Sequence, residues 1–202
     1  MIKTLSLSLF AFFITAILYA QVAEKPEDVS PLLIGEKIPD ISLKTIDGKT
    51  ISISTLWKGN TILIFYRGGW CPFCNAHLSE IGQIQKDLVK MGYQIIAVSP
   101  DAPQQLDKTI KQHKLEYQIL CNEGGSLFKA MGVAFKAPSK NYETLLTDYS
   151  EGANKEFILP VPSLFIINEM GEIIFEYINP NYKVRISKEL LTTVAYTLAV
   201  RK

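Results

Sequence analysis

Short runs of apolar, β-branched and aromatic residues recur along the chain and predict the strands of a sheet. The first run, Thr61–Tyr66 (TILIFY), is apolar almost without interruption, as in a strand buried on both faces. Gln94–Val98 and Tyr117–Leu120 predict two further strands. Near the end of the chain, Ser163–Ile167 and Glu172–Ile178 flank Asn-Glu-Met-Gly, a turn that predicts an antiparallel pair.

Between these strands, apolar positions spaced three or four residues apart predict amphipathic helices. The longest helix is expected over 72–91, and Gly92 follows it as a C-terminal capping glycine. Further helices are expected over 102–114, 125–131 and 187–200. Alternation of strands and helices predicts parallel strands with helices packed on the faces of the sheet.

Two segments stand outside this alternation. Residues 41–53 carry two short alternating runs around Asp47-Gly48, which predicts a β-hairpin ahead of the sheet. Residues 134–157 show no clear periodicity, and we expect an insertion on a surface loop with at most one helical turn. The predicted fold class is therefore α/β, with a mixed central sheet flanked by helices and an N-terminal β-hairpin.

The first residues have the pattern of an export signal. Lys3 supplies a positive charge, Leu5–Tyr19 forms an apolar run, and Ala20 offers a small residue for cleavage. The run is shorter than the roughly 20 residues of a typical spanning helix. We therefore expect residues 1–20 to be a signal peptide and the protein to be exported, to a periplasm or an equivalent space; an uncleaved membrane anchor is the alternative.

Composition limits the remaining possibilities. The polar, proline-containing residues 21–33 suit a linker, and 34–202 is long enough for one globular domain. The net charge is +1 with both signs interspersed, so the chain lacks the basic surface that nucleic-acid binding requires.

The chemistry-bearing motif is Cys71-Pro72-Phe73-Cys74, placed where the first buried strand gives way to the first long helix. A disulfide across two intervening residues closes too small a loop to stabilise the fold much, so reactivity explains this pair better than stapling does. Cys71 falls at the expected N-cap, where free N–H groups and the helix dipole favour a thiolate. Arg67 adds a positive charge nearby, and Cys74 should be more buried and less ionised.

Other residues support or compete with this interpretation. Trp70 directly precedes the motif and is expected to shield the disulfide or to fill the core. Pro162 precedes the strand 163–167, and a cis peptide bond there would bring backbone beside the cysteines. Zinc needs two more ligands, and Cys121, His77 and His113 lack suitable spacing.

We therefore expect no metal and no other cofactor. Cys121 is expected to be a free buried cysteine, with a third redox cysteine as the alternative. His77 is expected to be a surface or packing residue, and His113 to lie at a solvated helix end. The stretch Tyr177–Lys183 is interpreted as surface structure.

The runs FYRGGWCPFCNAHLSEI, IIAVSPD and LPVPSLFIINEMGEIIF together resemble the peroxiredoxin-like branch of the alkyl hydroperoxide reductase/thiol-specific antioxidant family. The resemblance covers nearly the whole chain after the signal, from about Leu33 to Lys202. It implies a thioredoxin-like fold, reduction of hydroperoxides through a cysteine thiolate, and re-reduction by a thioredoxin-type donor. The resemblance is also compatible with a homodimer of this chain.

The resemblance leaves the nucleophile and the substrate open. Aligned with typical peroxiredoxins, Cys74 takes the peroxidatic place, whereas the thioredoxin alignment makes Cys71 the nucleophile. The first functional hypothesis is an antioxidant enzyme that reduces hydroperoxides by cycling Cys71 and Cys74 between dithiol and disulfide. The second is an exported oxidoreductase acting on protein disulfides, and the third is a binding protein without catalytic activity.

Overall fold

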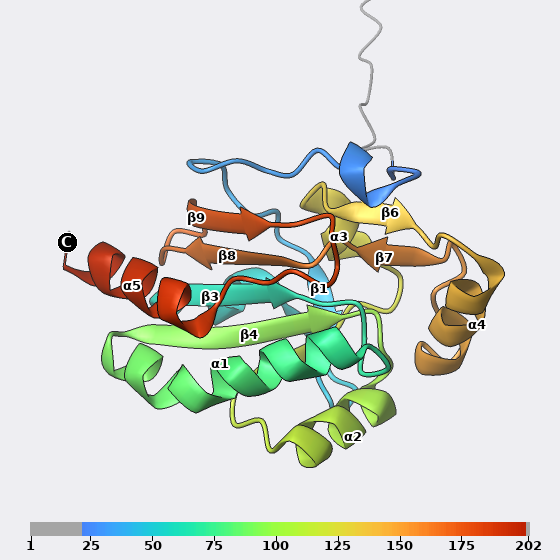
Figure 1. Cartoon of the computed structure of the whole chain (residues 1–202), viewed down its shortest axis with the longest axis horizontal. Helices are drawn as coiled ribbons and strands as arrows, with labels where there is room; N and C mark the ends of the chain where they lie inside the picture. Colours follow the sequence, from blue (N-terminus) through green and yellow to red (C-terminus); the bar gives the residue numbers. More distant parts are fainter. Residues whose placement is uncertain (1–21, 201–202) are drawn as a thin grey trace, which may run out of the picture.

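The computed structural model describes residues 22–200, whose centre is a seven-stranded mixed sheet in the order β2-β1-β5-β4-β3-β8-β9 (Figure 1). A separate two-stranded sheet pairs β6 with β7. The strands are β1 (Ser42–Lys44), β2 (Thr50–Ser52), β3 (Asn60–Phe65), β4 (Tyr93–Ser99), β5 (Gln118–Cys121), β6 (Ala134–Lys136), β7 (Ile158–Pro160), β8 (Ser163–Ile167) and β9 (Ile173–Ile178). The helices are η1 (Pro26–Asp28), η2 (Ile53–Leu56), α1 (Pro72–Lys90), α2 (Pro103–His113), α3 (Ser126–Ala130), α4 (Lys140–Tyr149) and α5 (Lys188–Ala199).

The sheet combines parallel and antiparallel pairs, which confirms the expected mixed α/β architecture. Strands β3, β4 and β5 are parallel neighbours, whereas β8 pairs antiparallel with both β3 and β9. The hairpin of β1 and β2 precedes them, and β1 is antiparallel to β5. Every residue of β3 is buried, as its continuous apolar run predicts.

Side chains of β3 alternate between two hydrophobic layers, because successive residues of a strand point to opposite faces. Ile62 and Ile64 pack with α1 and α5 on one face, and Leu63 and Phe65 pack with α3 on the other. The carboxyl end of β3 is therefore held between two packed layers. The turn that follows β3 starts from a rigid base.

The segment 134–157 differs from the prediction. It forms strand β6 and the helix α4, and β7 follows directly, so the expected loop with one helical turn is wrong. Figure 1 shows this unit beside the end of the sheet toward which β3 and β4 point. Leu146 of α4 is fully buried against Phe135 and Leu159, so the segment has its own small core. The hydrophobic pattern of short strands around a short helix is too brief to show a period.

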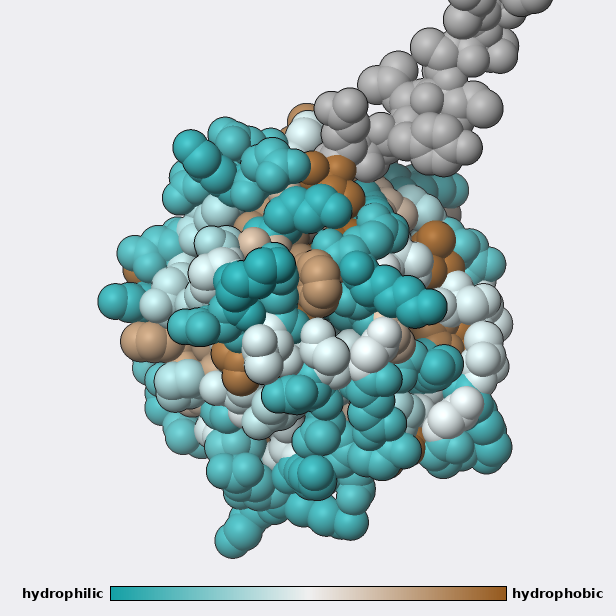
Figure 2. Space-filling view, turned by 90° about the vertical axis from the view of Figure 1, so that its right-hand side faces the viewer, coloured by the Kyte–Doolittle hydropathy of each residue, from teal (hydrophilic) through white to brown (hydrophobic). Residues whose placement is uncertain are grey.

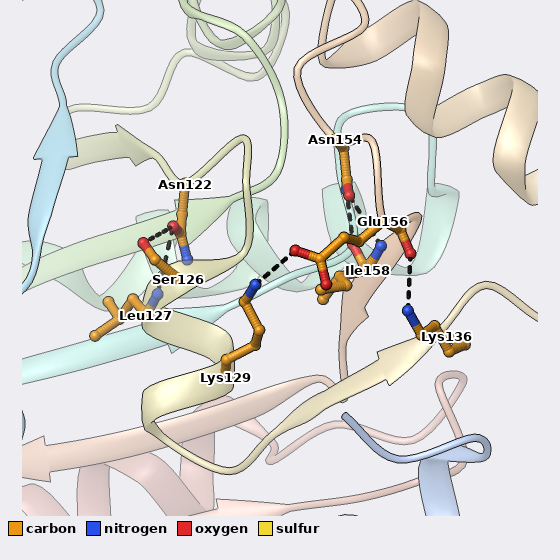
Figure 3. A network of polar contacts seen from close by, with 8 residues as sticks. All are labelled: Asn122, Ser126, Leu127, Lys129, Lys136, Asn154, Glu156 and Ile158. Atoms are coloured by element: carbon orange, nitrogen blue, oxygen red, sulfur yellow. Dashed lines mark hydrogen bonds and ion pairs between the residues drawn. The ribbon is translucent and has the colours of Figure 1, made fainter. Parts of the chain in front are cut away.

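Polar contacts support this unit and the neighbouring α3, and one of them joins the two (Figure 3). Asn154 acts as a clamp, because its amide donates to the carbonyl of Ile158 at 2.8 Å while its oxygen accepts from the N–H of the same residue at 2.9 Å. Lys129 of α3 pairs with Glu156 at 2.9 Å. Asn122 accepts from Ser126 at the start of α3 at 3.0 Å.

The segment predicted as a linker lies against the domain from its first described residues. Ala23 exchanges backbone hydrogen bonds with β6, donating to Ala134 and accepting from Lys136. Leu32 donates to the carbonyl of Met131 at 3.1 Å. The expected signal peptide, residues 1–20, lies outside the described residues. Within 22–200 no helix combines the length and the apolar character needed to cross a membrane.

Candidate active site

The cysteine motif begins α1 directly after a tight turn at the end of β3. Gly68 has φ +137, a conformation that glycine adopts without strain, and its carbonyl accepts from the N–H of Cys71 at 3.1 Å. The N–H of Gly69 donates to the carboxylate of Asp101 at 2.7 Å, and Asn75 of α1 donates to the carbonyl of Gly69 at 2.8 Å. These contacts tie the turn to both β4 and α1, and so they fix where the first cysteine lies.

Cys71 is the N-cap residue of α1, as predicted, and Pro72 occupies the first helical position. A hydrogen bond from the Cys74 thiol lowers the pKa of Cys71 to about 6, and the charges of Arg67 and Arg185 act in the same direction against burial. The pKa of Cys74 is raised well above its usual value, chiefly by burial and then by its contacts with Cys71. At neutral pH this pair therefore holds a thiolate at Cys71 and a thiol donor at Cys74.

Both cysteines are buried, which differs from the expectation that Cys74 is the more buried of the two. Cys71 and Cys74 are each 1% exposed. Phe73 packs edge-on against Tyr182, with ring centroids 5.7 Å apart, in the segment that joins β9 to α5. A helix N-cap is often accessible, but here the chain after β9 folds back over it. The same segment reaches Cys74 through Arg185.

Arg185 also belongs to this segment, and no sequence pattern pointed to it. Its Nη2 lies 3.5 Å from Sγ of Cys74, while Nη1 donates to the carbonyls of Tyr182 and Val184. The interpretation of Tyr177–Lys183 as mere surface structure is wrong at Tyr182. The residue that reaches the dithiol lies more than a hundred positions from it in the chain, so no local motif reveals it.

Arg67 is buried among aromatic rings beside the motif. Its guanidinium lies 4.2 Å from the ring centroid of Tyr182, 4.8 Å from that of Tyr142 and 5.0 Å from that of Trp70. Such stacking is favourable for a cation. Trp70 is half-buried and meets Tyr142 edge-on at 5.7 Å, so it joins the dithiol region to α4. The expected positive charge beside Cys71 is present at Arg67.

Pro162 lies near Arg67, but not in the expected conformation. Residues 22–200 contain no cis peptide bond, so the prediction of a cis bond at Pro162 is wrong. The N–H of Val161 donates to Val133 at 2.8 Å, and Ser163 then begins β8 opposite Phe65. Because the chain runs extended from β7 into β8 without reversing, a trans bond suffices here.

Asp101 is a further residue at this site that sequence reasoning did not single out. Its side chain is fully buried, and burial raises its pKa to about 7 although the Gly69 N–H and the Ser99 hydroxyl act in the opposite direction. A carboxyl group in the apolar surroundings of a turn is costly to ionise. Its position two residues after the strand run IIAVS is the only signal that could have pointed to it.

The other candidates are packing residues. Cys121 is a free, buried cysteine, as predicted, and burial raises the pKa of its thiol to about 12. His77 is buried in α1, and burial followed by the charge of Arg185 lowers its pKa to about 4, so it is neutral at pH 7. His113, expected to be solvated, is half-buried at the end of α2. Within 22–200 no group of His, Cys, Asp and Glu side chains could hold a metal ion.

A mixed sheet with a dithiol at the start of its first long helix defines a thioredoxin-like thiol oxidoreductase. The sequence profile of the AhpC/TSA family matches residues 34–176. The chain therefore belongs to the AhpC/TSA family, and it is an oxidoreductase of the peroxiredoxin, or thiol peroxidase, class.

Individual relatives are distant but cover most of the domain. Peroxiredoxin Bcp of Bacillus subtilis is 26% identical over 159 residues, which are 79% of this chain and 93% of that protein. The thiol-disulfide oxidoreductase ResA of Bacillus thuringiensis is 23% identical over 144 residues, 71% of this chain and 68% of that protein. A solved mutant of the peroxiredoxin 6 of Arenicola marina has a TM-score of 0.70 at 16% identity, over 84% of this chain and 74% of that one, and shows the shared fold.

Proposed function

We propose that the protein reduces hydroperoxides with Cys71 as nucleophile and Cys74 as resolving cysteine. The Cys71 thiolate attacks the terminal peroxide oxygen, the O–O bond breaks, and an alcohol or water leaves after taking up a proton. Cys71 is then a sulfenic acid. The Cys74 sulfur attacks it, forms the Cys71–Cys74 disulfide and releases water. A thioredoxin-type dithiol reduces that disulfide by exchange and is itself oxidised.

The observation that carries this proposal is the asymmetry of the two cysteines. Cys71 has a pKa of about 6 and accepts a hydrogen bond from Cys74, whose own pKa is raised by burial. The thiolate is the nucleophilic form, and the partner that keeps its proton can supply it to the departing oxygen. Cys74 follows Cys71 at a distance of one helical turn, so the resolving sulfur is already in place. The asymmetry favours Cys71 over the alternative assignment of Cys74.

Reaction requires movement of the covering segment. Asn179 to Ile186 connects β9 to α5 without regular structure, and Tyr182 in it packs on Phe73 over the start of α1. Few backbone hydrogen bonds hold this segment, the one from Asn179 to the carbonyl of Pro162 being long at 3.4 Å. Segments of this kind open at low free energy compared with the sheet. We propose that its opening admits both the peroxide and the reductant.

A second candidate function is the reduction of protein disulfides. Two observations favour it: the CxxC motif lies at a helix N-terminus, and ResA is among the relatives. In that reaction the Cys71 thiolate attacks a substrate disulfide, and Cys74 displaces the reduced substrate from the mixed disulfide. The dithiol geometry serves both reactions, so only substrate preference separates them.

One experiment distinguishes the two candidates. The reduced protein is mixed in a stopped-flow instrument with a hydroperoxide and, separately, with a disulfide protein such as insulin. The proposal predicts rapid one-to-one oxidation by the hydroperoxide, slow insulin reduction, and turnover when a thioredoxin system is added. Fast insulin reduction with no faster peroxide reaction than that of a free thiol would favour the second function.

We propose further that the protein acts outside the cytoplasm, most simply in a periplasm. The support is the sequence of residues 1–20: Lys3, an apolar run and Ala20. Expression of the full chain and N-terminal sequencing of the product test this. A product that begins at Gln21 supports export, and a product that retains residues 1–20 in the membrane fraction supports the anchor. The homodimer stays a prediction, which sedimentation of the reduced protein tests.

A further inference from the structure

A pocket of about 530 Å³ lies beside the dithiol, at the junction of the main sheet and the inserted unit. Its walls are largely apolar, with four prolines and three aromatic side chains; Phe135, Tyr142 and Tyr182 are the aromatic ones. Arg67 contributes the one guanidinium in this lining, and the lining's single carboxylate is that of Glu27, which is exposed. The volume is that of a typical small-molecule site.

Arg67 has no acidic partner among the residues that the structure describes. The ion pairs within 22–200 do not include it, and its Nε is buried with no hydrogen-bond acceptor. Arg67 is nevertheless 3% exposed. Contacts with the rings of Trp70, Tyr142 and Tyr182 compensate only part of the loss of hydration of a buried charge. Arg67 thus lines the pocket with its Nε lacking an acceptor.

We propose that this pocket binds a small molecule with an apolar body and one carboxylate, and that Arg67 binds the carboxylate. A planar guanidinium suits a carboxylate, since it can donate two parallel hydrogen bonds. The prolines and aromatic rings suit an alkyl or aryl body. Glu27 would repel a second carboxylate, so a monoacid fits better than a diacid. The inference goes beyond the proposed function, because it concerns binding and not the reduction of peroxide.

The surface around the site favours a small ligand over a macromolecule. Figure 2 looks at the end of the molecule toward which β3 and β4 point, and on the part of this face not drawn in grey the hydrophobic residues form small patches among hydrophilic ones. Protein interfaces have a larger apolar centre. The apolar area at this site is instead gathered inside the pocket, as a small-molecule site requires.

Binding at Arg67 has a consequence for the dithiol. The charge of Arg67 is among the causes that lower the pKa of Cys71. A carboxylate paired with Arg67 cancels part of that charge, so the pKa of Cys71 rises and the thiolate fraction at neutral pH falls. The ligand therefore reduces the reactivity of Cys71 without touching it.

Calorimetric titration of the reduced full-length protein tests the binding site with three probes: octanoate, 1-octanol and acetate. Octanoate should bind at least tenfold more tightly than octanol, which lacks the charge, and than acetate, which lacks the apolar body. Arg67→Gln should lose about tenfold or more of the octanoate affinity. Lys90→Gln, at an exposed cation on the last turn of α1, is the matched control and should bind octanoate as the wild type does.

Arg67→Gln removes a buried side chain and so could disturb the fold. Arg67→Lys, and the comparison of the three probes on the wild-type protein, therefore test the binding site independently of the Arg67→Gln protein. Equal binding of octanoate and octanol, equal binding of octanoate and acetate, or full octanoate affinity in a folded Arg67→Gln protein would each overturn the proposal. A Cys71 pKa that does not rise in saturating octanoate overturns the link to the dithiol. Octanoate binding without any peroxide reaction would refute the proposed function and leave this site standing.

Discussion

Replacing Cys74 tests how the thiolate at Cys71 is stabilised. The hydrogen bond from the Cys74 thiol is the largest cause of the low Cys71 pKa. Cys74→Ala removes this donor, whereas Cys74→Ser keeps an O–H at nearly the same position. We therefore expect the pKa of Cys71 to rise toward 9.0 in the alanine variant and to stay low in the serine variant.

The size of the effect on reactivity follows from the titration curve. With a pKa of about 6, roughly 90% of Cys71 is thiolate at pH 7, against about 1% for a cysteine with a pKa of 9.0. A thiolate of higher pKa is intrinsically more nucleophilic, with a Brønsted coefficient of about 0.4–0.5. This higher nucleophilicity offsets a factor of about 16–32 of the loss of thiolate. The alkylation rate at pH 7 therefore falls only about three- to sixfold when the pKa of Cys71 rises from about 6 to 9.0. The pKa itself is therefore the sharper quantity to measure.

The assay follows the ultraviolet absorbance of the thiolate, and the rate of iodoacetamide alkylation, from pH 4 to pH 10 in both variants. Each variant retains Cys121, whose pKa of about 12 keeps it out of this range. Circular dichroism checks that both proteins are folded. Equal Cys71 pKa values in the alanine and serine variants would refute the assigned role of the hydrogen bond, and the backbone N–H of residue 74 together with the arginine charges would then be the cause.

Three further predictions concern the surroundings of the dithiol. The raised pKa of Asp101 means that the folded state keeps a proton which the unfolded chain releases between about pH 4 and 7, so stability falls as pH rises through this range. Asp101→Asn should remove that loss, which is on the order of 2 kcal/mol between pH 5 and pH 7 in urea unfolding. Gly69→Ala should cost about 1–3 kcal/mol of unfolding free energy because its Cβ would overlap the hydroxyl of Thr109, whereas Gly82→Ala, in open space on α1, should stabilise by up to about 1 kcal/mol in the same measurement. Tyr182→Ala should raise the alkylation rate of the covered thiolate severalfold at unchanged pKa, and an unchanged rate would show that Tyr182 does not limit access.

Local patterns were sufficient for most of the fold. The run 61–66 and the period of 72–91 correspond to β3 and α1, since a fully buried strand and an amphipathic helix each leave a strong pattern. The segment 134–157 was missed because β6 and β7 have three residues each and α4 is a ten-residue helix between them. Elements this short owe their stability to contacts such as the Asn154–Ile158 clamp, and tertiary contacts leave no periodic signal.

The candidate site was predictable where its residues are adjacent in the chain. Arg67 lies in the turn after β3, and Cys71 and Cys74 lie at the start of α1, so their proximity follows from the motif. Arg185 and Tyr182 reach the site because the chain after β9 folds over α1, which depends on the whole topology. The burial of Cys71 was missed for the same reason: a helix N-cap indicates where the sulfur lies and says nothing of what covers it.

The most direct test of the account identifies the cysteine that reacts first with peroxide. Reduced Cys71→Ser and Cys74→Ser proteins are each mixed with one equivalent of hydroperoxide in the presence of a reagent that traps sulfenic acid, and the trapped residue is located by peptide mass spectrometry. The account predicts rapid trapping on Cys71 in the Cys74→Ser protein and no reaction above that of a free thiol in the Cys71→Ser protein. Rapid trapping on Cys74 in the Cys71→Ser protein would contradict it and make Cys74 the nucleophile.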